Sequence, residues 1–311
     1  MKKVKAVAPF YNEKDFKTQA YKAWVRQKGE QAKAHYPWRA FHGVAYRWDL
    51  PSLGILKSKK EARLRFVEPV SMSFDTFPDY ARYEIIPLIW DCWPKYIEKT
   101  VAWLKKHNVK SVIFTSSQIA EMMKERLPDV NVFKITEGIE VSRFGAGELL
   151  KERVVNLFEM GYMQRRYFNR KYPDVYKRLN QSPQGWTQEG FDGLKRFLEN
   201  TRVIVIYPRS VTEPNIAQGI ETLTQRYWEC MLSRIVMVGH APQELVDLVG
   251  YNPVIELNSE DEVGHVQDII EHIGDYQAMV DHNREVALRM APWEIRMKQV
   301  MEWLKGLGYE I

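Results

Sequence analysis

One segment of this chain is apolar over almost its whole length, and it constrains the fold more than any other. Arg202-Val203-Ile204-Val205-Ile206-Tyr207 is rich in β-branched residues and ends at Pro208. A strand with one face in water alternates apolar and polar residues, whereas a strand covered on both faces is continuously apolar. The segment therefore predicts a parallel sheet with helices on both sides.

Similar strands recur along the chain, and helical segments separate them. The sequence predicts further strands at 4–8, 40–48, 63–70, 84–91, 111–115, 130–135, 153–158, 235–238 and 253–257. It predicts helices at about 14–34, 94–108, 117–127, 165–179, 191–198, 243–249, 262–290 and 293–304. Such alternation is typical of the α/β class, and we expect two doubly wound halves.

The boundary between the halves is predicted within residues 137–148, where Gly138, Gly145 and Gly147 loosen the chain. We expect an N-terminal domain over 1–140 and a C-terminal domain over 141–294, and we expect the final helix, about 295–311, to pack back on the first domain. Ligands of such sheets bind beyond the carboxyl ends of the strands, so a cleft between the two sheets is the expected site.

Positive charge is concentrated at the start of the chain. Residues 1–66 hold 16 Lys and Arg against 5 Asp and Glu, a net +11, while the whole chain carries +5. The densest run is 57–65, and basic residues alternate with aromatic ones at 36–39 and 46–48. We expect run 57–65 to be a solvated loop or helix face; the alternative is attraction to an anionic acceptor, a membrane surface, an acidic glycan or nucleic acid.

Several classes of protein are not favoured. The start, Met1-Lys2-Lys3-Val4-Lys5, lacks the form of a secretory signal because its apolar segment stops at Pro9, and no apolar run approaches the length of a membrane span. Cys92 and Cys230 lie in apolar surroundings, so we expect buried free thiols in the cytoplasm. No metal-ligand spacing and no Asp-x-Asp is present, so we expect no metal and no bound cofactor.

The segment between strands 202–207 and 235–238 is the most informative about function. It reads Gly219-Ile220-Glu221-Thr222-Leu223-Thr224-Gln225-Arg226-Tyr227-Trp228-Glu229, with two acids eight positions apart across a predicted helix start. The unpaired N–H groups and partial positive charge of a helix start favour an anion such as a diphosphate. Acids on either side can hold sugar hydroxyls, so the segment predicts a nucleotide-sugar site.

At these residues the chain resembles the GT-B-fold glycosyltransferases of the group-1 (family four) type, nearest to their CgeB-like branch. The family spaces two Glu as Glu221 and Glu229 are spaced, and the branch adds an Arg at the position of Arg226. The family linker is matched by Glu137-Gly138-Ile139-Glu140, followed by Phe144. The resemblance covers about residues 84–305 and implies two Rossmann-like domains that face each other across a cleft.

The resemblance implies a role for each residue of this segment. Glu229 would accept hydrogen bonds from the donor's ribose hydroxyls, and Glu221 would contact the donor sugar. The N–H groups of Thr222, Leu223 and Thr224 would hold the phosphates. The structural alternative is that one Glu caps the helix and the other is simply solvated.

The resemblance also implies phosphate contacts after the strand at 153–158. The family has Gly-Arg there; here Gly161 is followed by Arg165 and Arg166. Gly161 would let the backbone approach the donor, or would form an ordinary turn. Arg165 or Arg166 would neutralise the departing diphosphate, and Arg226 competes for this role. The implied reaction is metal-independent glycosyl transfer from a nucleotide-diphosphate sugar, with retention of configuration.

The acceptor side is less defined. Many family members carry His-Asp where this chain has Trp90 and Asp91, so Asp91 is a candidate for orienting or deprotonating the acceptor hydroxyl, or alternatively for capping the helix near Pro94. The acceptor itself is open, and an anionic one fits the charge pattern. Alternative functions are a transferase that glycosylates modified DNA, a nucleotide-sugar epimerase of the same fold, and a non-catalytic two-lobed sugar-binding protein.

Overall fold

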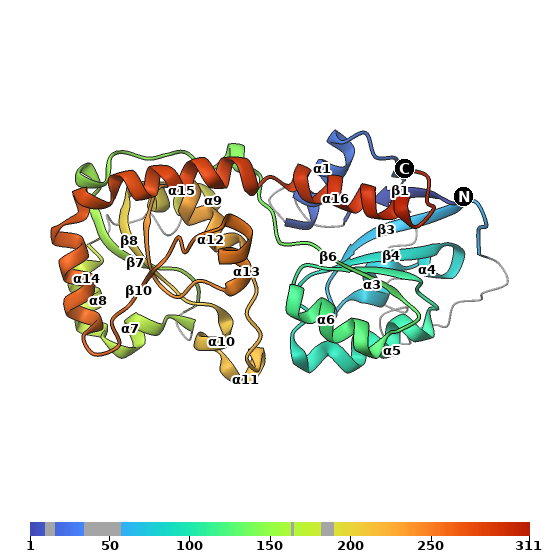
Figure 1. Cartoon of the computed structure of the whole chain (residues 1–311), viewed down its shortest axis with the longest axis horizontal. Helices are drawn as coiled ribbons and strands as arrows, with labels where there is room; N and C mark the ends of the chain where they lie inside the picture. Colours follow the sequence, from blue (N-terminus) through green and yellow to red (C-terminus); the bar gives the residue numbers. More distant parts are fainter. Residues whose placement is uncertain (10–15, 34–56, 163–164, 182–189) are drawn as a thin grey trace. The chain divides into compact units, whose positions relative to one another are not determined.

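The computed structural model describes residues 1–9, 16–33, 57–162, 165–181 and 190–311. The described chain divides into two compact units (Figure 1). Unit 1 comprises residues 1–138 together with 293–311, and unit 2 comprises residues 139–292. The predicted strand at 40–48 and the aromatic and basic motifs at 36–39 and 46–48 lie outside the described residues.

Within the described residues, the sheet of unit 1 has six parallel strands in the order β2-β1-β3-β4-β5-β6. They are β1 (Lys3–Val7), β2 (Gln31–Ala32), β3 (Glu61–Val67), β4 (Glu84–Ile89), β5 (Ser111–Phe114) and β6 (Asn131–Lys134). Strand β2 lies on one side of β1 and the later strands on the other, which is the reversal of strand order that defines a doubly wound sheet.

Helices cover both faces of this sheet. On one face α1 (Phe16–Arg26) and α16 (Trp293–Gly306) lie side by side (Figure 1), and Leu64 and Leu88 of the sheet share a buried cluster with Trp293. On the other face lie α5 (Ile97–Lys106) and α6 (Ser117–Arg126). The shorter elements are α3 (Met72–Thr76), α4 (Asp79–Arg82) and the 3₁₀ turn η3 (Pro94–Tyr96).

The end of the chain is tied to its beginning. The N–H of Val4 donates to the carbonyl of Glu310 at 2.8 Å, and the N–H of Glu310 donates to the carbonyl of Lys2 at 2.9 Å. Together with the packing of α16 on α1, these bonds place residues 293–311 in unit 1. The two units are therefore joined by two chain crossings, one at 138–139 and one at 292–293.

The described sheet of unit 2 has four parallel strands in the order β10-β9-β8-β7. They are β7 (Val155–Glu159), β8 (Thr201–Ile206), β9 (Val236–Gly239) and β10 (Ile255–Glu256). The helices are α7 (Tyr167–Lys171), α8 (Pro173–Leu179), α9 (Gly190–Asn200), α10 (Arg209–Thr212), α11 (Pro214–Ala217), α12 (Gln225–Leu232), α13 (Gln243–Val249), α14 (Glu262–Glu271) and α15 (Gln277–Met290).

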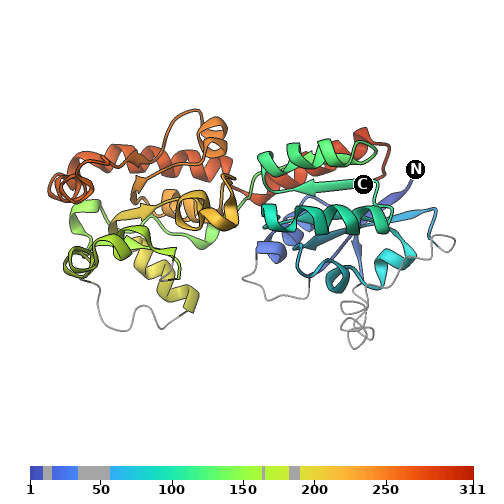
Figure 2. The same cartoon turned by 90° about the horizontal axis from the view of Figure 1, so that it is seen from below.

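The apolar strand β8 is buried on both faces, as its sequence predicts. Ile204 and Ile206 belong to a core cluster that includes Trp228 of α12. Val203 and Val205 belong to a separate cluster, which α7, α8 and α14 help to form. Figure 2 shows helices on both sides of the strands of each unit. Successive residues of β8 thus fill two different cores, which explains why the strand carries no polar alternation.

Three predicted helices end earlier than their patterns indicate. Helix 14–34 stops at Arg26, and Lys28 adopts a left-handed φ of 63° before β2 begins. Helix 165–179 is divided into α7 and α8 at Pro173, whose missing N–H cannot continue the first helix. Helix 262–290 is divided by the 3₁₀ turn η8 (Ile273–Tyr276). No helix within the described ranges has the length and apolarity to cross a membrane.

Candidate active site

The first part of the candidate site is the turn after β7. Gly161 has a φ of 106°, a conformation that residues with a Cβ rarely adopt, so the turn requires glycine. A Cβ added to Gly161 would lie 3.6 Å from Nη1 of Arg226 and 3.9 Å from Cβ of Arg165. The structure therefore brings together three predicted site residues that are up to 65 positions apart in the sequence.

Arg165 and Arg226 line a small polar pocket at the carboxyl ends of β7 and β8. Its lining residues are Glu159, Met160, Arg165, Ile204, Val205, Ile206, Tyr207, Thr212 and Arg226. Among the described residues, the Arg226 guanidinium has no hydrogen-bond or ion-pair partner. Two guanidinium groups beside one pocket favour an anionic ligand, because each offers several fixed N–H donors.

Arg165 is already engaged. Its Nε lies 2.7 Å from Oε2 of Glu213, and Nε of Arg209 lies 2.7 Å from the same oxygen. Glu213 follows α10, so two arginines from different segments share one carboxylate at the edge of the pocket. An incoming phosphate would have to compete with Glu213 for Arg165.

Arg166 and Glu159 fix the backbone of this region. Nε of Arg166 donates to the carbonyl of Gly161 at 2.9 Å. The buried carboxylate of Glu159 accepts the N–H groups of Phe168 at 3.1 Å and Asn169 at 2.9 Å. Burial raises the pKa of Glu159, although these backbone bonds oppose the increase. The first N–H groups of α7 are thus bound by a protein carboxylate.

The helix at the predicted phosphate site starts later than expected. Thr224 is the N-cap of α12, which begins at Gln225, so Glu229 lies one turn into the helix and not two. The N–H of Leu223 donates to Oε2 of Glu244 on α13 at 2.9 Å. The predicted phosphate contact of Leu223 is therefore not available in this structure, because its N–H is bound to Glu244 and its side chain is buried. Thr222 and Thr224 lie partly exposed beside it.

Glu221 lies before this helix, and each of its two carboxylate oxygens contacts a side chain from another segment. Oγ of Ser210 donates to its Oε1 at 3.0 Å, and Nε2 of His240 lies 3.4 Å from its Oε2. On the other side of the ring, Nδ1 of His240 lies 3.1 Å from Oε2 of Glu256. The result is a row of polar side chains across the carboxyl ends of β8, β9 and β10.

Glu229 has an unusual environment. Its side chain is partly exposed, and its carboxyl group has no hydrogen-bond or ion-pair partner among the described residues. Burial raises its pKa to about 7, and the charges of Arg226 and Arg143 only partly oppose this. A carboxyl group with a raised pKa and no partner in the described chain is available to a ligand: it donates a hydrogen bond when protonated and accepts hydrogen bonds when ionised.

Asp91 belongs to unit 1, at the carboxyl end of β4. Its φ of 49° is left-handed, and its Oδ1 accepts a hydrogen bond from the indole of Trp93 at 3.2 Å. The residue before the turn η3 is Trp93 and not Asp91, and its side chain makes no capping bond. The carboxylate of Asp91 is exposed. Trp90, which stands where the family has His, is buried against Phe16.

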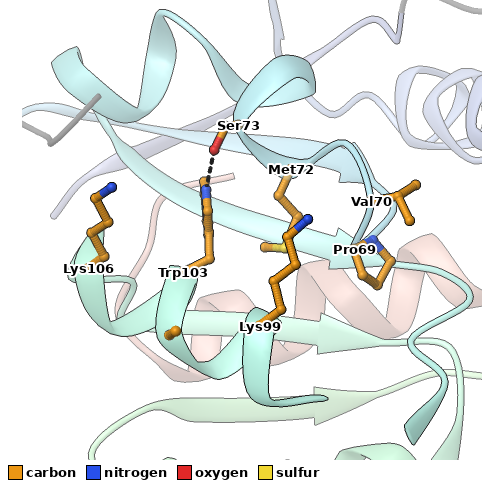
Figure 3. Close-up of a pocket in the computed structure, with 8 residues that line it drawn as sticks. Pro69, Val70, Met72, Ser73, Lys99, Trp103 and Lys106 are labelled. Atoms are coloured by element: carbon orange, nitrogen blue, oxygen red, sulfur yellow. Dashed lines mark hydrogen bonds between the residues drawn. The ribbon is translucent and has the colours of Figure 1, made fainter. Parts of the chain in front are cut away.

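Unit 1 also contains an apolar pocket between α3 and α5. In Figure 3 the side chains of Lys99, Trp103 and Lys106 extend from α5 toward α3, and the indole of Trp103 donates to Oγ of Ser73 at 2.7 Å. Met72 and Val70 complete its apolar side. The pocket therefore combines an apolar wall with two exposed lysines.

The basic run 57–65 is only partly a solvated surface. Lys59 and Lys60 are exposed, as expected, but the expectation is wrong for residues 61–65, which belong to strand β3. Arg63 and Arg65 are each only 5% exposed, because they belong to β3. Arg65 pairs with Asp79 at 3.0 Å, and the Arg63 guanidinium lies 3.7 Å from the ring centre of Tyr83. Earlier lysines form ion pairs as well: Lys2 with Glu84, Lys3 with Glu30, Lys5 with Glu61, and Lys17 with Glu68. Much of the described N-terminal charge is thus neutralised inside unit 1.

Sequence reasoning missed His240, Ser210 and Glu213. Each follows a predicted strand closely: His240 comes directly after Gly239 of β9, and Ser210 and Glu213 follow β8. The carboxyl ends of parallel strands meet at one edge of a sheet, so polar residues just after two neighbouring strands were a usable signal.

Another residue, Arg234, binds loop 146–148 through the carbonyls of Ala146 and Gly147.

The described parts of the chain contain no group of three or more His, Cys, Asp or Glu side chains arranged to hold a metal ion. Cys92 and Cys230 are buried and unpaired with each other. The site chemistry visible in unit 2 is therefore that of arginines, carboxylates and one imidazole.

Comparison with known proteins identifies the fold. Neither a protein-family model nor a curated protein matches the sequence. Among solved structures, the chain is similar to a sucrose-phosphate synthase from Thermosynechococcus elongatus, with a TM-score of 0.58, 10% identity, and 99% of each chain covered. It is also similar to TarM, with a TM-score of 0.50 and 12% identity over 85% of this chain and 57% of that one. The predicted fold class is confirmed: the chain has the α/β GT-B fold, built from two Rossmann-like parallel-sheet units.

Proposed function

We propose that this protein is a glycosyltransferase that moves a sugar from a nucleotide-diphosphate sugar to an acceptor hydroxyl. The observation that carries the proposal is that Arg165 and Arg226, which both lie next to the Gly161 turn, line one pocket at the carboxyl edge of the second sheet. Anionic ligands of parallel sheets bind at this edge. Glu221 lies just before α12, and Glu229 lies within this helix, as Arg226 does.

Arg226 is the arginine we assign to the donor diphosphate. Its guanidinium lies next to the Gly161 turn and is not engaged by another described side chain, whereas Arg165 is shared with Glu213. Arg166 donates a hydrogen bond to the carbonyl of Gly161, so we assign it to holding this turn. Thr222, Thr224 and the first turn of α12 add N–H groups and a helix dipole, which favour a leaving diphosphate without a metal ion.

Glu229 is assigned to the donor ribose and Glu221 to the donor sugar. The unpartnered carboxyl group of Glu229 suits a vicinal diol, since one carboxylate can accept two hydrogen bonds. The resemblance to the family-four type, and to its CgeB-like branch, adds retention of anomeric configuration to the proposal. The buried free cysteines support a reducing compartment such as the cytoplasm.

On the acceptor side, Asp91 is proposed to orient or deprotonate the acceptor hydroxyl, because it is an exposed carboxylate at the carboxyl end of a central strand. Lys99 and Lys106 beside an apolar wall favour an acceptor with an anionic group. A panel of sugar acceptors with and without a phosphate tests this, and the phosphorylated members should be preferred.

A thermal-shift screen against UDP, GDP, CMP and dTDP tests the proposal directly. A ligand that binds the native state raises the melting temperature by mass action, so at least one nucleotide should do so. Glu229→Ala should keep its fold and lose donor turnover. A chain that binds none of these nucleotides at millimolar concentration is not a glycosyltransferase of this type.

A further inference from the structure

His240 is placed beside Glu221 by a contact that only glycine permits. The preceding residue, Gly239, has a φ of 134°, and a Cβ there would lie 2.1 Å from the carbonyl oxygen of Ile206. The N–H of His240 then donates to the same carbonyl at 3.0 Å. This close approach of β9 to β8 fixes the position of the imidazole at the edge of the sheet.

The ring bridges two carboxylates that belong to different segments. Nδ1 lies 3.2 and 3.1 Å from the two oxygens of Glu256 on β10, and Nε2 lies 3.4 Å from Oε2 of Glu221. Glu256 is itself held by Nδ2 of Asn252 at 3.2 Å. Among the described residues, Tyr227 of α12 is a further titratable group that contacts His240: its hydroxyl donates to the His240 carbonyl at 2.9 Å.

The two sides of the ring respond differently to loss of a proton. The protonated imidazole has an N–H on both nitrogens and can donate to both carboxylates. Nδ1 faces both oxygens of Glu256 at shorter distances, so the neutral ring keeps its proton there. Nε2 then presents a lone pair to Glu221, and the link between His240 and Glu221 is lost. Partial burial lowers the pKa of His240, but Glu256 and Glu221 outweigh it and the net pKa is raised.

We propose that His240 is a positioning residue: its protonated ring orients Oε2 of Glu221 for the donor sugar, and deprotonation removes this contact while Oε1 stays bound to Ser210. The inference rests on the proposed function, because it deepens the role of Glu221. It predicts that the affinity for the sugar part of the donor depends on pH, whereas the affinity for the diphosphate part does not depend on His240.

Calorimetric titration of the full chain with UDP-glucose and with UDP, from pH 5.5 to 8.5, tests this, with the GDP pair used if the nucleotide screen selects GDP. The quantity measured is the Kd of His240→Ala divided by that of the parent, so any titration of the ligand itself cancels. For the sugar nucleotide this ratio should be about five to ten at pH 5.5, the size of one charge-assisted hydrogen bond at a partly exposed site, and should fall toward one at pH 8.5. For the bare diphosphate it should stay near one throughout.

Two further variants separate positioning from structure. UDP-glucose affinity should decrease as the pH rises and His240 loses its proton. In Glu256→Gln this decrease should occur at a lower pH, because the variant lacks one charge that favours the protonated ring. His272→Ala is the matched control, since His272 also contacts an acid, Asp268, and lies on the surface of the same unit. It should change neither affinity. If both nucleotides bind and the ratio does not vary with pH, the role of His240 is wrong. If no nucleoside diphosphate binds, the proposed function itself is wrong.

Discussion

Gly239 approaches Ile206 so closely that a Cβ on Gly239 would lie 2.1 Å from the Ile206 carbonyl oxygen. The contact is with backbone, which cannot turn aside as a side chain can. Gly239→Ala should therefore destabilise the chain by about 2–4 kcal/mol, from strain at the positive φ and displacement of β9 from β8. Chemical denaturation measures the loss. Gly250→Ala is the control for φ alone, since its Cβ would meet nothing within 4 Å; equal losses in both variants would contradict the close-approach argument.

The raised pKa of Glu229 should be visible as pH-dependent stability. Burial raises this pKa from 4.5 to about 7, so the folded chain binds more protons than the unfolded chain between these values. Stability due to this group is present below pH 4.5 and is lost as pH rises to 7. Glu229→Gln should match the parent near pH 4.5 and exceed it by about 1–3 kcal/mol at pH 8. The exposed Glu152 provides the control, and Glu152→Gln should show no such trend.

Arg226 should contribute strongly to nucleotide affinity. Arg226→Ala removes a guanidinium that is not engaged elsewhere in the described chain, and should weaken nucleoside diphosphate binding at least tenfold. Arg226→Lys should recover only part of this, because an ammonium lacks paired donors. Arg178, an exposed arginine on α8, is the matched control. An equal effect of Arg178→Ala would mean that only net charge matters.

Glu213 should act against nucleotide binding. It neutralises Arg165 and Arg209 at the edge of the pocket, with both Nε atoms 2.7 Å from one oxygen. Glu213→Gln should tighten nucleoside diphosphate binding about threefold, because it frees positive charge next to the phosphate. Calorimetry at low and high salt measures the change, which should shrink as salt screens it. Weaker binding in the variant would show that Glu213 orients Arg165 instead of competing with the ligand.

Arg153 should be essential for stability although it lies outside the site. Its side chain is 1% exposed and donates to the carbonyls of Glu148, Thr201, Ala146 and Ser233 at 2.8–3.0 Å. Arg153→Met leaves buried carbonyls without donors and should cost about 3–5 kcal/mol. The midpoint of chemical denaturation measures this loss of stability. The comparison variant is Arg202→Met, because Arg202 is partly exposed.

The fold followed from local pattern because burial on two faces leaves a signature in each strand. After their first one or two residues, strands β8 and β4 are continuously apolar, and these apolar runs predicted both the parallel sheet and its two helical layers. Helix ends were less predictable. The division at Pro173 follows from a single residue, but the ends at Arg26 and Glu271 depend on packing with other segments, which no local pattern contains.

The sequence by itself determined the α/β class, the buried strands, and the segment with Glu221, Arg226 and Glu229 as the place to look for a donor site. Only the tertiary structure decided which side chains meet there. Arg226 lies next to the Gly161 turn, and Arg165 forms an ion pair with Glu213. The Leu223 N–H donates to Glu244, and His240 lies between Glu221 and Glu256. The physical reason is range. Burial and backbone preference act on neighbouring residues, whereas ion pairs and hydrogen bonds at the edge of a sheet join strands whose separation along the chain carries no periodic signal.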